Sequence, residues 1–257
     1  MKSRISVLVI ICLLINTKMS NSKIQKYKIN KVVIDAGHGG HDPGALGNIF
    51  KEKTITLDIS LELGKMISEN MHKIKIIYTR CKDEFIELHE RAKVSNKNNA
   101  DLFISIHCNA SKRKNAHGAE TYTMSIKNVT ANSAVAKREN SVILLEGNYE
   151  DNYQGFDPNS PESHILFSMY QNAYHDNSLK FAQKIQQKFK SYGRKCRGVK
   201  QEGFLVLWKT AAPSVLIEVG FITNSKEEKY LASAAGKKAI AQSIFSALKE
   251  YIDEIEH

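Results

Sequence analysis

The chain has little cysteine, no long apolar run in its body, and fewer acidic than basic residues. Only 4 of its 257 residues are cysteine, which excludes a small domain held together by disulfides. The composition, 42% hydrophobic and 25% charged, is that of a globular protein and argues against a disordered, collagen-like or coiled-coil chain. No repeat or linker divides the sequence, so its length indicates one large domain. The net charge of +10 is compatible with a nucleic acid, an anionic membrane or another anionic polymer as partner.

The N-terminus has the pattern of a secretory signal peptide, which we assign to residues 1–22. A basic start precedes an apolar run from Ile5 to Ile15, and small polar residues follow from Ser20. The run is too short to span a bilayer comfortably. A buried N-terminal strand is the alternative, and a lipid anchor on Cys12 is disfavoured because isoleucines precede it. Export to the periplasm or cell envelope argues against nucleic acid as partner, and we expect a monomer.

Removal of the signal changes both the charge and the cysteine balance. Residues 1–20 contain three basic residues and no acid, so the mature chain falls from +10 to +7. The cysteines that remain are Cys81, Cys108 and Cys196. Because three is odd, at least one thiol stays unpaired in a monomer, and the sequence does not determine which.

Short apolar runs alternate with amphipathic segments in the mature chain. This alternation predicts a single α/β domain over residues 28–255, with a mostly parallel or mixed twisted sheet and helices on both faces. Strands are predicted at residues 31–35, 75–79, 102–106, 119–123, 204–207 and 215–219. Helices are predicted over 55–67, 88–95 and 240–252, with another beginning near 177.

A long insertion, residues 126–176, separates the fourth predicted strand from the next helix. Six acids and no lysine or arginine lie between Glu139 and Glu162, so the rest of the mature chain carries +13. Segments of this length without regular structure are usually functional or disordered. Residues 132–145 are predicted to form a helix that places Glu139 and Glu146 on a face with two valines. A carboxylate on such an apolar face needs a partner if the face packs.

Three side chains have the character and position of metal ligands. His38 follows the first predicted strand in a glycine-rich loop, His107 ends the third, and Glu52 precedes the first helix. Ligands gather at the carboxyl ends of strands in α/β sheets, and two histidines with one carboxylate leave a fourth zinc position open. Ordinary polar roles for these residues remain an alternative. Strand alternation points Cys108 to the opposite face. The histidines that lack this context are predicted to lie at the surface: His41, His117, His164 and His175.

Glu218 is a further candidate because it lies within an apolar predicted strand. Ionised residues are rarely buried without a partner. Next to a metal, its carboxylate would serve as a general base toward water. A salt-bridged structural carboxylate is the alternative.

Taken together, these motifs resemble the zinc-dependent N-acetylmuramoyl-L-alanine amidases of the cell-separation type. The resemblance runs from about Lys31 to Tyr251. It is carried by Val-Ile-Asp-Ala-Gly-His-Gly-Gly at 33–40, Lys-Glu-Lys at 51–53, Tyr-Thr-Arg at 78–80 with Asp83, Ser-Ile-His-Cys-Asn-Ala at 105–110, and Leu-Ile-Glu-Val-Gly-Phe-Ile-Thr-Asn at 216–224. Several ordered motifs at these spacings are far more specific than any one alone.

The resemblance implies one zinc ion on His38, Glu52 and His107, with Glu218 as the catalytic carboxylate. The reaction it implies is cleavage of the amide between N-acetylmuramic acid and L-alanine of the peptidoglycan stem peptide, in wall remodelling and daughter-cell separation. In relatives with a long insertion, a helix covers the zinc until a protein activator displaces it. This similarity makes residues 126–176 a candidate autoinhibitory segment, with Glu139 as the first candidate for the open metal position and Glu146 as the second. A solvated acidic loop is the alternative.

Two rival functions remain compatible with the sequence. One is a zinc peptidase that acts on the stem peptide, and the other is a wall-binding protein with a vestigial zinc site. The intact set of four candidate residues argues against the second. No separate wall-binding domain is visible, so targeting would come from the catalytic domain or from a partner.

Overall fold

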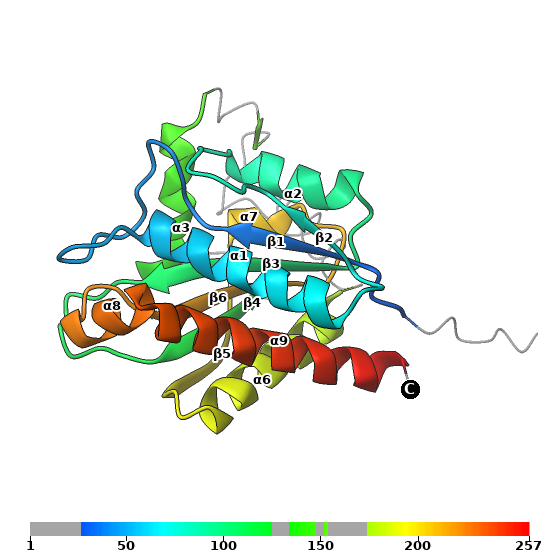
Figure 1. Ribbon diagram of the computed structural model, residues 1–257. Coiled ribbons are helices and arrows are strands. Elements are labelled where there is room, and N and C mark those ends of the chain that lie inside the picture. Colours follow the sequence, from blue (N-terminus) through cyan, green and yellow to red (C-terminus); the bar gives the residue numbers. More distant parts are fainter. Residues whose placement is uncertain (1–26, 125–133, 148–151, 154–173, 257) are drawn as a thin grey trace, which may run out of the picture.

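The computed structural model describes residues 27–124, 134–147, 152–153 and 174–256 (Figure 1). The predicted signal peptide, Cys12, His164 and most of the predicted insertion lie outside these residues. Within them, no helix combines the length and the apolar character needed to cross a membrane.

A six-stranded mixed sheet forms the centre of the fold, as predicted. Its strands are β1 (Lys31–Ala36), β2 (Lys75–Tyr78), β3 (Leu102–Asn109), β4 (Ala119–Met124), β5 (Cys196–Glu202) and β6 (Ser214–Phe221). The order is β2-β1-β3-β6-β4-β5, and all neighbours are parallel except β4 and β6. Strands β1, β3 and β6 are almost entirely buried, which explains their continuous apolar runs.

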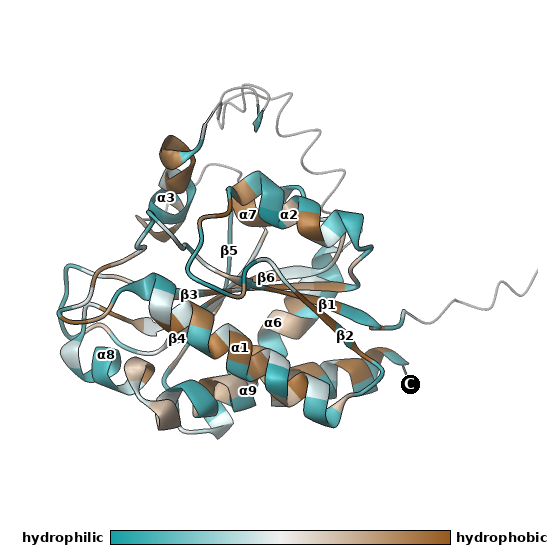
Figure 2. Cartoon of the chain, turned by 45° about the horizontal axis from the view of Figure 1, so that its top comes forward, coloured by the Kyte–Doolittle hydropathy of each residue, from teal (hydrophilic) through white to brown (hydrophobic). Residues whose placement is uncertain are grey.

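Helices cover both faces of the sheet (Figure 1). One face carries α1 (Glu52–Asn70), α6 (His175–Ser191) and α9 (Ala234–Glu256), with α8 (Ser225–Ala232) packed against α9. The other carries α2 (Leu88–Lys97), α7 (Leu205–Trp208), α3 (Ala134–Asn140) and the 3-10 helix η1 (Ser141–Leu145). Figure 2 shows apolar stretches alternating with polar ones along α1 and α9, as amphipathic packing requires. The structure therefore has two hydrophobic cores, one on each side of the sheet.

One predicted strand was wrong, and one observed strand was missed. Residues 205–207, predicted as part of a strand at 204–207, lie in helix α7, because a short buried apolar run has no periodicity that distinguishes a strand from a helix. The strand in this region is β5, which was not predicted. It is a half-exposed edge strand rich in lysine, arginine and glycine, and so lacks apolar alternation. The helix predicted over 132–145 divides into α3 and η1.

Candidate active site

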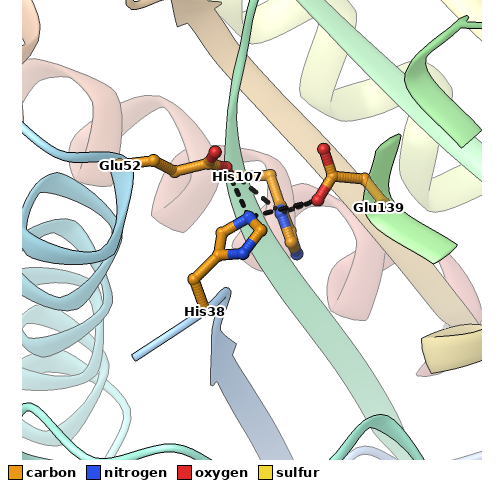
Figure 3. Close-up of side chains that lie close together, drawn as sticks. All are labelled: His38, Glu52, His107 and Glu139. Atoms are coloured by element: carbon orange, nitrogen blue, oxygen red, sulfur yellow. Dashed lines mark ion pairs between the residues drawn. The ribbon is translucent and has the colours of Figure 1, made fainter. Parts of the chain in front are cut away.

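The three predicted metal ligands lie together where β1 and β3 end and α1 begins (Figure 3). His38 follows β1, His107 lies near the end of β3, and Glu52 is the first residue of α1. The Oε1 atom of Glu52 is 3.2 Å from both His38 Nε2 and His107 Nδ1. All three side chains are buried.

Glu139 from the insertion helix α3 completes this group (Figure 3). Its Oε2 atom lies 3.1 Å from His38 Nε2 and 3.0 Å from His107 Nδ1, and the four candidate ligand atoms are all within 4.8 Å of one another. A cavity of only about 10 Å³ is left beside these side chains, which is room for about one water molecule. In this arrangement α3 covers the candidate ligand atoms.

Glu146, the second candidate for this position, lies elsewhere. Its carboxylate accepts hydrogen bonds from Leu88 N at 2.7 Å and from the Tyr153 hydroxyl at 2.7 Å. Glu146 therefore caps the first turn of α2 and attaches the insertion to it. It shares a second cluster with Glu87 and His89, apart from the group around His38.

The group around His38 has the donors that a zinc ion requires. His38 Nε2, His107 Nδ1 and Glu139 Oε2 are buried and have no hydrogen-bond partner among the described residues. Polar atoms without partners are costly inside a protein, and a cation between them would satisfy all three. Two imidazole nitrogens with carboxylate oxygens form a donor set typical of catalytic zinc. The residues present therefore fit this metal.

The charges in the cluster also favour a cation. Burial opposes ionisation of Glu52, but the charge of the facing His38 and the 3.2 Å contacts of its carboxylate with both imidazoles lower its pKa to about 2. Burial disfavours protonation of His107, yet the Glu139 carboxylate raises its pKa to about 9. In the absence of a metal, the negative carboxylates therefore favour the protonated, positively charged form of both imidazoles.

Neighbouring groups orient two of the three candidate ligands, His38 and Glu52. His38 Nδ1 donates a hydrogen bond to Asp42 Oδ2 at 2.7 Å, which leaves Nε2 free as a ligand. Glu52 Oε1 accepts from the backbone N–H of Cys108 and Oε2 from that of Ala45, both at 2.7 Å. Asp42 was not predicted. Its position four residues after His38 was the available signal, but the pairing depends on the conformation of the glycine-rich loop.

The loop that carries His38 has a strained backbone conformation that neighbouring residues stabilise. His38 has a φ of 63°, in the left-handed region that non-glycine residues rarely occupy. A Cβ atom on Gly37 would lie 2.4 Å from the His107 ring, so only glycine allows the close approach. The buried Arg91 donates to the carbonyls of Ala36 at 2.8 Å and His38 at 3.0 Å, and to Asp35 Oδ1 at 2.9 Å. These bonds hold the strained loop in place.

We expect Asp42→Asn to weaken zinc binding by roughly 10- to 100-fold, as is typical when the hydrogen-bond partner of a ligand is changed. The carboxamide has the same shape but no charge to stabilise the His38 ring in its ligating tautomer. Competition with a zinc chelator measures the effect, and the control is Asp58→Asn on α1, whose carboxylate pairs with Lys237 of α9 and not with a candidate ligand. An unchanged zinc affinity in the folded Asp42→Asn protein would contradict the assigned role.

Glu218 lies beside the candidate ligands on β6, at the register position of His107 on β3. Its Oε1 atom is 3.2 Å from Arg138 Nη2, and Oε2 has no hydrogen-bond partner among the described residues. Burial raises the pKa of Glu218 to about 8, although the charge of Arg138 opposes the shift. A buried carboxylate of this kind, adjacent to a candidate metal centre, is well placed for proton transfer.

The remaining predicted residues lie away from this group. Cys108 is buried on the opposite face of β3 in the core beneath α1, as strand alternation predicts. His41 and His117 are exposed, and His175 is half-buried. The described cysteines form no disulfide with one another: Cys81, Cys108 and Cys196 are free thiols.

Comparison with known proteins places this geometry in context. A family described as N-acetylmuramoyl-L-alanine amidase matches residues 32–250. AmiA of Escherichia coli is 36% identical over 226 residues, which cover 86% of this chain and 75% of AmiA. AmiC of Escherichia coli is 33% identical over 224 residues, which cover 86% of this chain and 52% of AmiC. The chain thus spans about half the length of that relative.

Solved structures agree with the sequence matches. An N-acetylmuramoyl-L-alanine amidase from Clostridium difficile superposes with a TM-score of 0.65 at 26% identity, covering 88% of this chain and 98% of that one. The CwlD amidase from Clostridioides difficile, solved in complex with the GerS lipoprotein, superposes with a TM-score of 0.65 at 25% identity, covering 88% and 99%. The predicted fold and enzyme class are confirmed, and the chain belongs to the N-acetylmuramoyl-L-alanine amidase family.

Proposed function

We propose that the protein is a zinc-dependent peptidoglycan hydrolase that cleaves the amide between N-acetylmuramic acid and L-alanine. The observation that carries this proposal is the buried convergence of His38, Glu52 and His107 next to Glu218, in a chain of the amidase family. The proposal includes export through residues 1–22 and a catalytic domain over residues 28–255. It also gives residues 126–176 a role as an autoinhibitory segment.

In this proposal, His38, His107 and Glu52 would hold the metal, with Glu218 beside them on β6. A zinc ion held there would polarise the amide carbonyl and acidify water as a Lewis acid. Glu218 takes a proton from the attacking water and returns it to the leaving alanine nitrogen, so one carboxylate serves both steps. Asp42 keeps His38 in its ligating tautomer throughout.

Glu139 supports the autoinhibitory role of the insertion, because its carboxylate takes the place that a fourth ligand or substrate would need. Helix α3 covers the group, and Glu146 attaches the same segment to α2. We propose that a protein activator displaces this helix in the cell envelope. The complex of the relative CwlD with a lipoprotein is consistent with regulation by a partner. The basic body of the mature chain suits an anionic wall polymer.

Mass spectrometry of the fragments released from purified sacculi tests the reaction. We expect intact stem peptides with a free alanine amino group and glycan with free lactyl carboxylates, and we expect a zinc chelator to abolish their release. A protein lacking residues 126–176 provides an open form for the assay. Shortened stem peptides would indicate the rival peptidase, and release that persists in chelator would contradict the zinc mechanism.

A further inference from the structure

Arg138 and Glu139, adjacent in α3, place opposite charges on two sides of the candidate site. Glu139 Oε2 contacts the histidines, while its Oε1 accepts a hydrogen bond from Arg138 Nε at 2.8 Å. The Arg138 guanidinium continues to Glu218, where Nη2 donates to Oε1 at 3.2 Å. The insertion therefore engages both the candidate ligands and the candidate general base.

The surroundings of the guanidinium are made of hydrogen-bond acceptors. Besides Glu218 Oε1, Arg138 Nη1 faces Asn109 Oδ1 at 3.4 Å and the carbonyl oxygen of Ala110 at 3.5 Å. The second oxygen of Glu218 is buried and has no hydrogen-bond partner among the described residues. Two carboxylate oxygens, an amide oxygen and a carbonyl oxygen favour a cation with several N–H donors.

The acceptor on Asn109 is held in place independently of Arg138. Asn109 is 1% exposed, and its Nδ2 donates to Glu120 Oε2 at 3.2 Å. Its Oδ1 also accepts from the backbone N–H of Ala110 at 2.8 Å, which directs the oxygen toward the site. Glu120 is itself buried and paired with Lys200 at 3.0 Å. These bonds hold the Asn109 acceptor in place without any contribution from Arg138.

The arrangement of charges corresponds to the products of amide hydrolysis. Water adds its oxygen to the carbonyl carbon, the carbon–nitrogen bond breaks, and the nitrogen takes up protons. The products at neutral pH are a carboxylate and an ammonium group. The Arg138–Glu139 pair presents a carboxylate at the candidate ligands and a cation 2.8 Å from it, between that carboxylate and Glu218.

We infer that Glu218, Asn109 Oδ1 and the Ala110 carbonyl form a subsite for the amino group of the leaving L-alanine, and that Arg138 occupies this subsite in the closed protein. The inference rests on the proposed amide hydrolysis. It assigns Asn109 and Glu120 as positioning residues for the leaving group. In this inference Glu139 takes the place of the product carboxylate and Arg138 that of the product ammonium group, so the insertion resembles both products.

Binding of a small amine to the full-length, zinc-loaded protein tests the subsite without any turnover. The probe is L-alaninamide at pH 7, and N-acetyl-L-alaninamide is the matched compound without a positive charge. Titrations followed by NMR are compared for wild type, Arg138→Met and Lys137→Met, since Lys137 is an exposed cation next to Arg138. Arg138→Gln replaces Arg138→Met if the latter does not fold.

We expect L-alaninamide to bind Arg138→Met at least tenfold more tightly than wild type or Lys137→Met, with shifts at the amides of residues 109–111. The acetylated compound should not bind, and adding Asn109→Ala should weaken amine binding about threefold to tenfold, in line with one lost hydrogen bond. Equal binding of the two compounds, or equal binding by wild type and Arg138→Met, would overturn the subsite. Amidase activity of the form lacking residues 126–176, with no charge-selective binding, would remove the subsite alone. Charge-selective binding with no amidase activity of that open form would uphold a cation subsite and contradict the proposed function.

Discussion

Replacing Glu139 with alanine is expected to raise the activity of the isolated protein on purified sacculi by roughly tenfold to a hundredfold, the usual range of such couplings. The substitution removes the carboxylate that lies 3.0 Å from His107 Nδ1 and 3.1 Å from His38 Nε2. It also leaves Arg138 without its nearest anion. Helix α3 then keeps its apolar contacts, and Glu146 still attaches the same segment to α2. The contact between α3 and the candidate ligands is lost.

Release of labelled stem peptides from sacculi measures this effect without any activator. Lys137→Ala is the matched control, because Lys137 is exposed on the same helix and loses a charge of the opposite sign. Glu146→Gln should have a smaller effect, since Glu146 attaches the insertion to α2 and lies apart from the ligands. If folded Glu139→Ala is no more active than Lys137→Ala, the insertion does not inhibit through this contact.

Changing Glu218 to glutamine is expected to lower the activity of the open protein by about 10²- to 10⁴-fold, the contribution typical of a general acid–base group. The carboxamide keeps the shape of the side chain in its fully buried position on β6. It cannot accept the proton from water or return it to the alanine nitrogen. The comparison is best made in the Glu139→Ala background, so that inhibition by the insertion does not hide the loss.

Two measurements separate loss of chemistry from loss of structure in this variant. Zinc content should remain near one ion per chain, because among the described residues the Glu218 carboxylate pairs with Arg138 and forms no hydrogen bond or ion pair with the three proposed ligands. Thermal unfolding should change little, since the carboxamide keeps the size and shape of the buried side chain and brings no charge into this position. Retained activity with normal zinc content would assign the general base to another group and leave Glu218 as a partner of Arg138.

The fold was largely predictable because its central strands are buried on both faces. Such strands are continuous apolar runs, so β1, β3 and β6 were identified within one to three residues at each end, and α1, α2 and α9 followed from their apolar period. The prediction was wrong at α7, and it missed β5 and α8. A four-residue apolar run does not distinguish helix from strand, and an edge strand facing solvent does not need apolar residues.

The site was predictable to the extent that its chemistry is carried by motifs. His38, Glu52, His107 and Glu218 were recognised from residue type, strand ends and resemblance to one family, and the structure brings all four together. Glu139 was preferred over Glu146 by similarity to helices in relatives. In the structure the Glu139 carboxylate contacts the candidate ligands, whereas Glu146 accepts a hydrogen bond from the first residue of α2, although both lie on one predicted helical face.

Residue types and their order along the chain were sufficient to indicate the α/β class, the family and the candidate ligands, because local patterns and motifs reflect burial and ligand chemistry. Only the tertiary structure shows that Glu139, rather than Glu146, joins Glu52 beside the two histidines, and that Arg138 pairs with Glu218. It also decided that Asp42 orients His38 and that Asn109 and Glu120 form a buried pair. These contacts join residues from different elements or depend on a φ of 63° at His38, and their distances follow from packing rather than from spacing in the sequence.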